Sequence, residues 1–415
     1  MILEREDAAS GPSLRLTSRR LMTLVAVALA AVMLVTLAPS VTSAAVAPPA
    51  TYSPSNGVWF NNPFGRPIAK HTLNNRMDRA INSTRAGATV RISMYSFSRH
   101  RTAKAIIAAY RRGVNVRVLL NDHQMTPAMQ RLIRVLGTNV KKPSFIHVCK
   151  DGCRVRPKGN NHAKFLTFTD VNGVPNVTMV TSGNLTINGG AVQWNDLMII
   201  TRRQDTHDAF AAVFDQMSAD KRVVDSYRFV KTGPYQLEFF PISKGSSLDP
   251  YLRDLNKVRC RGVAPGAGRG GRTVVRVVMW TWAGKRGMAI AKKLRSLDNA
   301  GCHVEVIVGA PSAGPLRELR RPGRFGGVAI RDSRRDYSED YGFKGAHQKY
   351  ILIDGRYGND PRHRRVITGS MNMTGGALTH GDEVMVQVPS RRYWRQYTAN
   401  FNLIWRNWAR PLSHY

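Results

Sequence analysis

The chain has 415 residues, of which 62 are Lys or Arg and 27 are Asp or Glu, so its formal net charge at pH 7 is +35. This length suggests two or three domains with a large buried core. Beyond Ala45 no stretch is apolar enough to span a bilayer, which excludes a transmembrane domain in that part of the chain. The charge predicts attraction to polyanions such as nucleic acid, anionic membranes or anionic wall polymers, although a need for solubility would also account for it.

The N-terminal residues resemble a targeting segment rather than part of the folded core. A cluster of arginines between positions 15 and 20 precedes an apolar run from Leu21 to Ala38, and small residues follow up to Ala44. This order is typical of a secretory signal peptide, so we expect residues 1–44 to be removed and the mature protein to be secreted. An uncleaved membrane anchor is the alternative, because the run is about as long as a minimal spanning helix.

Helices and strands alternate in the next part of the chain. Leu73, Met77 and Ile81 recur every four residues and predict an amphipathic helix. Three further elements are predicted after it: a strand over Val90–Phe97, a helix over Thr102–Arg112 and a strand over Val114–Leu120. This β-α-β order favours an α/β fold.

Four cysteines follow the targeting segment: Cys149, Cys153, Cys260 and Cys302. An even number in an exported chain predicts two disulfides, and we expect Cys149 to pair with Cys153 and Cys260 with Cys302. Free buried thiols are one alternative. A zinc site that uses His147 with the first two cysteines is another, although no second ligand pair follows it.

One short motif occurs twice, 185 residues apart (347 − 162). The copies are His162-Ala-Lys164 with Ser182-Gly-Asn184, and His347-Gln-Lys349 with Ser370-Met-Asn372. Each copy supplies an imidazole, an ammonium group, a hydroxyl and an amide, which suit binding a phosphate and attacking it. We therefore expect one composite active site where two halves of the protein meet.

The second half repeats the element order of the first. Its predicted elements are a helix around Leu252–Val258, a strand over Val274–Trp282, a helix over Met288–Asn299 and a strand over Val304–Val308. The motif strands also correspond, as do two later segments: Asp196–Ile200 with Glu383–Val388, and Phe210–Met217 with Tyr393–Trp408. We predict an α/β protein of two similar halves, residues 45–238 and 239–415, each a central mixed β-sheet flanked by helices, packed with pseudo-twofold symmetry.

Aromatic residues end the equivalent strands of the two halves. Tyr95 and Phe97 end the first, and Trp280 and Trp282 end the second. We expect these rings to pack in the core, with the rim of the site as the alternative. The histidines that have no counterpart in the other half, including His123, are expected on the surface.

The second copy of the motif is complete and allows roles to be assigned. Residues two apart on a strand share a face, so His347 and Lys349 point the same way. Lys349 would neutralise a phosphate oxygen while His347 faces phosphorus, and Ser370 and Asn372 would donate hydrogen bonds to the same oxygens. Glu383 is suited to accept from the far nitrogen of His347 and so to fix its tautomer.

The first copy differs at two positions: the residue before Ser182 is Thr181, where the second copy has Gly369, and the acid after the lysine is displaced by one residue. In the second copy, Asp354 follows Lys349 by five residues. In the first copy the residue five after Lys164 is Thr169, and the acid, Asp170, comes one residue later. Alignment of residues 195–199 with residues 382–386 makes Asp196 the expected partner of His162. We expect the site to survive these differences, although an inactive scaffold is an alternative.

The pattern H-x-K-x4-D with a following G-S-x-N resembles the phospholipase D superfamily, and the two ordered copies span both halves. The resemblance implies an active site with neither metal ion nor cofactor, and structural roles for Asp170 and Asp354. It also implies that one histidine forms a covalent phosphohistidine while the other protonates the leaving group and then activates water. By this analogy His162 is expected to be the nucleophile and His347 the general acid and base.

The expected function is that of a secreted phospholipase D-type phosphodiesterase that hydrolyses phospholipid head groups, with transphosphatidylation to alcohols as a further reaction. A metal-independent endonuclease acting on DNA or RNA is the first alternative. A non-catalytic protein that binds polyanions is the second. The expected partners are a phosphodiester substrate and, through the basic surface, nucleic acid or an anionic surface, with the protein itself a monomer.

Overall fold

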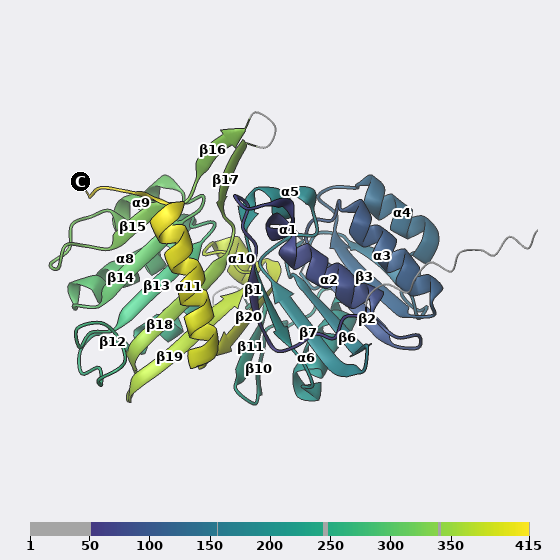
Figure 1. Cartoon of the computed structure of the whole chain (residues 1–415), viewed down its shortest axis with the longest axis horizontal. Helices are drawn as coiled ribbons and strands as arrows, with labels where there is room; N and C mark the ends of the chain where they lie inside the picture. Colours follow the sequence, from purple (N-terminus) through teal and green to yellow (C-terminus); the bar gives the residue numbers. More distant parts are fainter. Residues whose placement is uncertain (1–50, 156, 244–247, 339–341, 415) are drawn as a thin grey trace, which may run out of the picture. The chain divides into compact units, whose positions relative to one another are not determined.

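Two large mixed β-sheets form the framework of the protein (Figure 1), in a computed structural model that describes residues 51–155, 157–243, 248–338 and 342–414. The predicted signal peptide, residues 1–44, lies outside the described residues. Within the described part of the chain, no helix combines the length and the apolar character that crossing a membrane would need.

The first sheet has seven strands and belongs to the first half of the chain. Its central strands β2 and β3 are parallel, and β6, which follows the first motif, runs antiparallel to β2. In spatial order the strands are β1 (Gly57–Phe60), β9 (Asp196–Ile200), β7 (Val174–Thr181), β6 (Phe165–Val171), β2 (Thr89–Met94), β3 (Asn115–Asn121) and β4 (Phe145–Cys149).

The second sheet has the same arrangement around its centre. Strands β13 and β14 are parallel, and β18, which follows the second histidine, runs antiparallel to β13. Its main path is β10 (Arg228–Thr232), β11 (Tyr235–Phe240), β20 (Gly381–Val388), β19 (Asp360–Gly369), β18 (Lys349–Tyr357), β13 (Val274–Met279), β14 (His303–Val308), β15 (Ala329–Asp332) and β21 (Arg410–Pro411). Strand β12 (Val258–Arg259) joins it by pairing with β18.

Helices cover these sheets. In the first half they are α1 (Pro67–Lys70), α2 (Thr72–Asn82), α3 (His100–Arg111), α4 (Pro127–Leu136), α5 (Ile187–Ala191) and α6 (Gln204–Ser218). In the second they are α7 (Pro250–Asn256), α8 (Gly284–Asn299), α9 (Ala313–Leu319), α10 (Gly375–Thr379) and α11 (Arg391–Asn407). Helix α11 lies across the second sheet over β18 and β19 (Figure 1).

Local sequence signals explain where several helices begin and end. Thr126 accepts a hydrogen bond from the backbone of Met129 and so caps the start of α4, and Asp249 caps α7 in the same way. Gly113 and Gly301 adopt positive φ values of 87° and 95° after α3 and α8, where a residue with a side chain would be strained. The observed bounds of the elements confirm the strands and helices predicted for both halves, with their ends shifted by a few residues.

The two halves exchange equivalent contacts next to the two motifs. Strand β5 (Asn160–Asn161), just before His162, pairs in parallel with residues 381–382 of β20. Strand β17 (Gly342–Ala346), just before His347, pairs in parallel with β8 (Gln193–Trp194), and β16 (Arg335–Ser338) completes that small sheet. The segment before His162 thus pairs with β20 of the second half, and the segment before His347 pairs with β8 of the first half.

The hydrophobic core also connects the halves. One buried cluster lies under α2 to α4 and another under α7 and α8, and a third contains side chains from both sheets, including Phe165, Met198, Tyr350 and Val384. Strands β10 and β11 lie near the predicted boundary at residue 238 and pair into the second sheet. The position of that boundary stays a prediction.

Both predicted disulfides are present. Cys149 is bonded to Cys153 and Cys260 to Cys302. The sulfur atoms of the first pair are therefore not available as zinc ligands, and His147 instead contacts Asp220 through Nε2 at 2.9 Å. Among the described residues, the one group of side chains at metal-ligand spacing is His147, Cys149 and Asp220, which includes a cysteine of this disulfide.

Candidate active site

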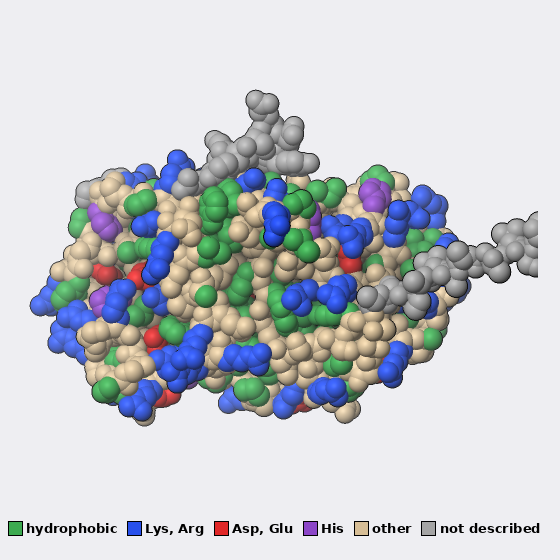
Figure 2. Space-filling model, viewed as in Figure 1, with side chains coloured by type: hydrophobic (Ala, Val, Ile, Leu, Met, Phe, Trp, Pro, Cys, Tyr) green, Lys and Arg blue, Asp and Glu red, His purple; other side chains and the backbone are tan. Residues whose placement is uncertain are grey.

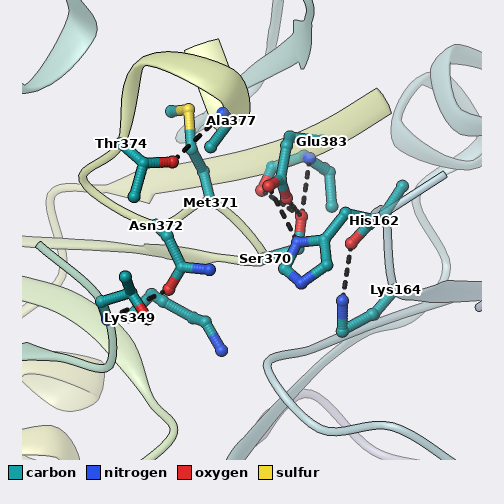
Figure 3. Close-up of polar contacts among 12 residues, drawn as sticks. His162, Lys164, Lys349, Ser370, Met371, Asn372, Thr374, Ala377 and Glu383 are labelled. Atoms are coloured by element: carbon teal, nitrogen blue, oxygen red, sulfur yellow. Dashed lines mark hydrogen bonds and ion pairs between the residues drawn. The ribbon is translucent and has the colours of Figure 1, made fainter. Parts of the chain in front are cut away.

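His162 is held at two points by consecutive residues of β20. Its backbone N–H donates to the carbonyl of Asp382 at 3.0 Å, and its Nδ1 lies 2.8 Å from Oε1 of Glu383. Because an ionised carboxylate only accepts hydrogen bonds, Nδ1 carries the proton and Nε2 keeps its lone pair. Figure 3 shows the free edge of the ring facing the ammonium groups of Lys164 and Lys349. Burial lowers the pKa of His162 to about 4, although Glu383 acts in the opposite direction.

His347 is held in the same way by the first half, but by a neutral partner. Its backbone N–H donates to the carbonyl of Trp194 at 2.9 Å, and its Nδ1 lies 3.0 Å from Oδ1 of Asn195. The amide nitrogen of Asn195 donates to the Gly189 carbonyl, which fixes Oδ1 toward the ring. Burial, followed by the charge of nearby Lys349, lowers the pKa of His347 well below its usual value.

The expected pairing of acids with histidines was wrong in two respects. The contacts cross between halves, so Glu383 serves His162 rather than His347. In addition, Asp196, the expected partner of His162, bonds to Thr368 and Tyr397 instead, and the residue that serves His347 is Asn195. Thr181, which precedes Ser182, pairs with Leu197 in the first sheet, and Gly369, which precedes Ser370, pairs with Met385 in the second. Leu197 therefore corresponds to Met385. Two residues before each of these, Asn195 corresponds to Glu383.

Asp196 points to the other face of β9, as the residue after Asn195 must on a strand. Its Oδ2 accepts hydrogen bonds from Thr368 and Tyr397, both at 2.7 Å, and burial raises its pKa. One sequence signal would have identified Asn195. It follows Asn184 by eleven residues (195 − 184), the spacing between Asn372 and Glu383 (383 − 372).

The two motif serines also have a different role from the expected one. Ser182 donates to Oδ1 of Asn195 at 3.1 Å, and Ser370 donates to Oε2 of Glu383. Both side chains are fully buried. The serines therefore orient the groups that hold the histidines, and their hydroxyl hydrogens are not free for phosphate.

The two motif asparagines keep their amide nitrogens available. Oδ1 of Asn184 accepts from the Ser96 backbone at 3.2 Å, and Oδ1 of Asn372 accepts from the Thr281 backbone at 3.3 Å. No hydrogen-bond acceptor for either Nδ2 is found within the described part of the chain. Each amide is thus oriented by its oxygen so that its nitrogen can donate to an anion.

Two fully buried lysines complete the site. The ammonium of Lys164 donates to the backbone carbonyl of His162 at 2.8 Å. The ammonium of Lys349 donates to the backbone carbonyl of His347 and lies 3.1 Å from Nε2 of the same residue. Burial lowers the pKa of Lys164 to about 7 and that of Lys349 well below its usual value. The positive groups of the site outnumber its negative ones, and a bound phosphodiester would supply the missing negative charge.

The acids that follow the lysines make structural contacts away from the histidines. Asp170 accepts from the backbone of Gly173 in the turn between β6 and β7, and an ion pair joins it to Arg85 at 3.5 Å. Asp354 forms a 3.1 Å ion pair with Arg364 on the neighbouring strand. The structural roles expected for both acids stay a prediction.

Aromatic rings border both histidines. The ring centroid of Tyr95 lies 5.0 Å from that of His162, and His123 stacks on Tyr95 at 4.0 Å. Trp280 lies 5.3 Å from His347 at the equivalent strand end. Phe97 and Trp282, two residues further along each strand, are buried in the core as expected. The alternative of a rim position is thus the correct one for Tyr95 and Trp280.

The sequence of the chain matches one known protein family. The family model described as "Cardiolipin synthase, PLD-like domain" matches residues 77–218 and 272–405, which is more than half of the chain and covers both motif copies. No curated protein sequence matches the chain.

Solved structures share the fold at low sequence identity. Phosphatidylserine synthase from Haemophilus influenzae is 13% identical with a TM-score of 0.56, and the match covers 86% of this chain and 88% of that one. Polyphosphate kinase from Porphyromonas gingivalis is 12% identical with a TM-score of 0.53, covering 85% of this chain, which spans about half (51%) of the kinase.

Proposed function

This chain belongs to the phospholipase D-like family, whose members act as phosphodiester-processing enzymes, and on that premise we propose that it hydrolyses phosphodiesters through a covalent phosphohistidine. The observation that carries the proposal is the pair of half-sites, in which each histidine donates from Nδ1 to an acceptor on the opposite half. Because Nδ1 of each ring is occupied in this way, Nε2 is the nitrogen left for chemistry on one phosphate, and Nε2 of His347 lies 3.1 Å from the ammonium of Lys349.

In the first step, Nε2 of His162 attacks phosphorus and the bond from phosphorus to the leaving oxygen breaks. His347, protonated once the phosphate anion is bound, gives its proton to that oxygen, so a neutral alcohol leaves. The ammonium groups of Lys164 and Lys349 and the amides of Asn184 and Asn372 stabilise the charge on the oxygens that do not react.

In the second step, His347 takes a proton from water, and the resulting hydroxide attacks phosphorus. The bond from phosphorus to His162 breaks, and His162 returns to its neutral form. An alcohol that replaces water in this step yields transphosphatidylation instead of hydrolysis.

The assignment of His162 as nucleophile is supported by the different partners of the two rings. A phosphorylated imidazole that keeps its Nδ1 proton is positively charged, and the carboxylate of Glu383 stabilises that charge. The amide of Asn195 stabilises the cationic ring of His347 less, so this imidazolium is the stronger acid and releases its proton more readily.

For the substrate we propose phospholipid head-group phosphodiesters, met by a protein secreted after removal of residues 1–44. Ile187, three residues after Asn184, and Met125, two residues after His123, expose 49% and 50% of their surfaces. Apolar side chains that are exposed and close in sequence to residues of the site suit contact with a lipid surface. Two disulfides suit an oxidising environment outside the cell.

Single-stranded nucleic acid is the second candidate substrate. Tyr95 and Trp280 place aromatic rings next to the two histidines, and such rings stack on bases of any sequence. Figure 2 shows Lys and Arg side chains spread over the visible face with few acidic ones, which suits binding along a phosphate backbone.

One experiment separates these functions. Mature protein is incubated with EDTA against phosphatidylcholine vesicles and against single-stranded DNA, with the His162→Ala variant as control. Release of choline supports the lipid substrate, and cleavage of DNA supports the nuclease. Binding of either without turnover, equal in protein and variant, would refute catalysis and leave a polyanion-binding protein.

A further inference from the structure

Arg154 lies outside the reacting groups, yet its side chain is 1% exposed and bridges the two halves. Its Nε donates to Oδ1 of Asp382 at 2.9 Å, and its backbone N–H donates to Oδ2 of the same carboxylate at 3.2 Å. The remaining guanidinium nitrogens donate to the carbonyls of Ser226 and Phe240. Every nitrogen of this guanidinium therefore has an acceptor, as a buried arginine requires.

Asp382 connects this cation directly to His162. Its carbonyl accepts the backbone N–H of His162, and the next residue, Glu383, holds Nδ1 of the same ring. Residues 381–382 also pair with β5, the strand that leads into His162. Both contacts that orient His162 thus come from the start of β20, where Arg154 binds.

The second histidine has a different anchor at the equivalent position. The carbonyl that accepts from His347 belongs to Trp194, whose side chain is 1% exposed and packs against Phe64 with ring centroids 6.1 Å apart. One histidine is therefore positioned through a buried ion pair and the other through apolar packing. A change at Arg154 should act on the first ring and leave the second in place.

The disulfide between Cys149 and Cys153 restrains the segment that carries Arg154. Cys153 immediately precedes Arg154, whose backbone N–H and side chain both bind Asp382. A Cβ on Gly152 would lie 3.2 Å from an oxygen of Asp382, so this loop packs closely on the carboxylate. The covalent bond limits the conformations in which Arg154 could leave Asp382.

We propose that Arg154 is a positioning residue for His162, acting through Asp382 and β20, and that the Cys149–Cys153 disulfide holds Arg154 in place. The inference rests on the proposed function, in which His162 attacks phosphorus. It assigns Arg154 no contact with the substrate, and it predicts a defect in the formation of the covalent intermediate.

The test compares Arg154→Met and Arg154→Lys with Arg276→Met as the matched control. Arg276 pairs with Glu305 at 2.7 Å between β13 and β14, on strands that carry neither motif. Two soluble phosphodiesters are used, identical except that one releases p-nitrophenol and the other an alkyl alcohol. We measure kcat, KM and the single-turnover rate of adduct formation.

Arg154→Met should lower kcat and adduct formation about 10- to 100-fold with little change in KM, as loss of a group that orients a reacting residue typically does. The loss should be equal for both leaving groups, because attack is slowed and protonation is not. Arg154→Lys should restore part of the rate, and Arg276→Met should match the parent protein.

A double variant separates positioning from stability. Replacing a buried ion pair with apolar residues is often neutral for stability, so Arg154→Met/Asp382→Leu should recover the melting temperature while adduct formation stays slow. Wild-type rates in a folded double variant would overturn the proposal. A loss that appears only with the alkyl leaving group would also overturn it, because the defect would then lie in protonation by His347.

The disulfide is tested in the same assay. Cys149→Ser/Cys153→Ser should slow adduct formation, and Cys260→Ser/Cys302→Ser should not, since that bond is made outside the segments that hold His162. Equal rates in the two double variants would remove the disulfide from the proposal. If His162→Ala itself keeps full turnover, the proposed function fails, whereas an inactive His162→Ala beside a fully active Arg154→Met refutes the inference alone.

Discussion

At the level of single residues, the two halves supply chemically different acceptors to two otherwise equivalent histidines. His162 has the carboxylate of Glu383, and His347 has the amide of Asn195. Each unit of pKa difference between the rings corresponds to about 1.4 kcal/mol of differential stabilisation of the protonated form. A site with nearly twofold contacts can therefore assign separate roles to its two histidines by changing one residue.

His162→Ala and His347→Ala should each lower kcat/KM by at least ~10³-fold on a phosphodiester with an alkyl leaving group, because a nucleophile or general acid is seldom replaced by water. Melting temperatures should change little. With a p-nitrophenol leaving group, which departs without a proton, the first turnover of His347→Ala should recover while His162→Ala stays inactive.

Equal recovery of both variants on the p-nitrophenol substrate would contradict the assignment of roles. Substantial turnover of either variant on the alkyl substrate would contradict the composite site itself.

On the p-nitrophenol substrate, whose leaving group needs no proton from His347, the pH dependence of the free enzyme follows from two shifted groups. The pKa of His162 is lowered to about 4, so the ring is neutral above that value and attack is lost as pH falls through it. The pKa of Lys164 is lowered to about 7, so the ammonium loses its charge as pH rises through that value and phosphate binding weakens. We expect kcat/KM to rise above pH about 4 and to fall above pH about 7.

The profile of kcat should differ on its alkaline side. A bound phosphate anion raises the pKa of both lysines, so the decline in kcat should begin at a higher pH than the decline in kcat/KM. Rate measurements over pH 3 to 10 at saturating and limiting substrate check both limbs. An alkaline limb at the same pH in both profiles would argue against buried lysines as the phosphate ligands.

At the level of elements, strand register decides which acid contacts a histidine. Glu383→Gln keeps the hydrogen bond to His162 but removes the charge, so kcat should fall roughly ten- to a thousandfold. Asp196 lies on the opposite face of its strand and contacts Thr368 and Tyr397. Asp196→Asn should mainly lower stability, by about 1–3 kcal/mol, because one hydroxyl loses its acceptor.

Thermal unfolding and kcat measured side by side separate these effects. A larger loss of kcat in Asp196→Asn than in Glu383→Gln would mean that the register does not determine the partner of either histidine.

The sequence allowed the elements to be predicted well, because periodicity, glycines and caps are local signals. The motif copies likewise predicted which histidines, lysines and asparagines meet. The crossed contacts of Glu383 and Asn195 could not be predicted, because pairing between β5 and β20 is a long-range property that no local pattern encodes. Arg154 was missed for the same reason, since its partner Asp382 lies 228 residues away.

At the level of the whole molecule, the site gathers buried positive groups within a strongly basic protein. Two histidines and two lysines share this space, and among the described residues Glu383 is the carboxylate that forms an ion pair with one of the two rings, that of His162. Such a cluster favours an anionic substrate over a cation, because a divalent ion is normally held by several oxygen ligands. The large surface charge then increases the rate of encounter with polyanions.

The charges of the site also determine whether the reaction needs a metal ion and where the covalent adduct forms. Turnover should persist in EDTA, because the lysines and asparagines neutralise the phosphate. Acid-quenching destroys a phosphohistidine, so a reaction with substrate labelled at phosphorus is stopped in base, and mass spectrometry should place the adduct on His162. Glu383→Gln should reduce the adduct, because the positively charged ring loses its carboxylate, while His347→Ala should accumulate it when p-nitrophenol leaves, because water is no longer activated. An adduct on His347 would reverse the roles and keep the mechanism, whereas strict dependence on a divalent ion with no adduct on either histidine would refute it.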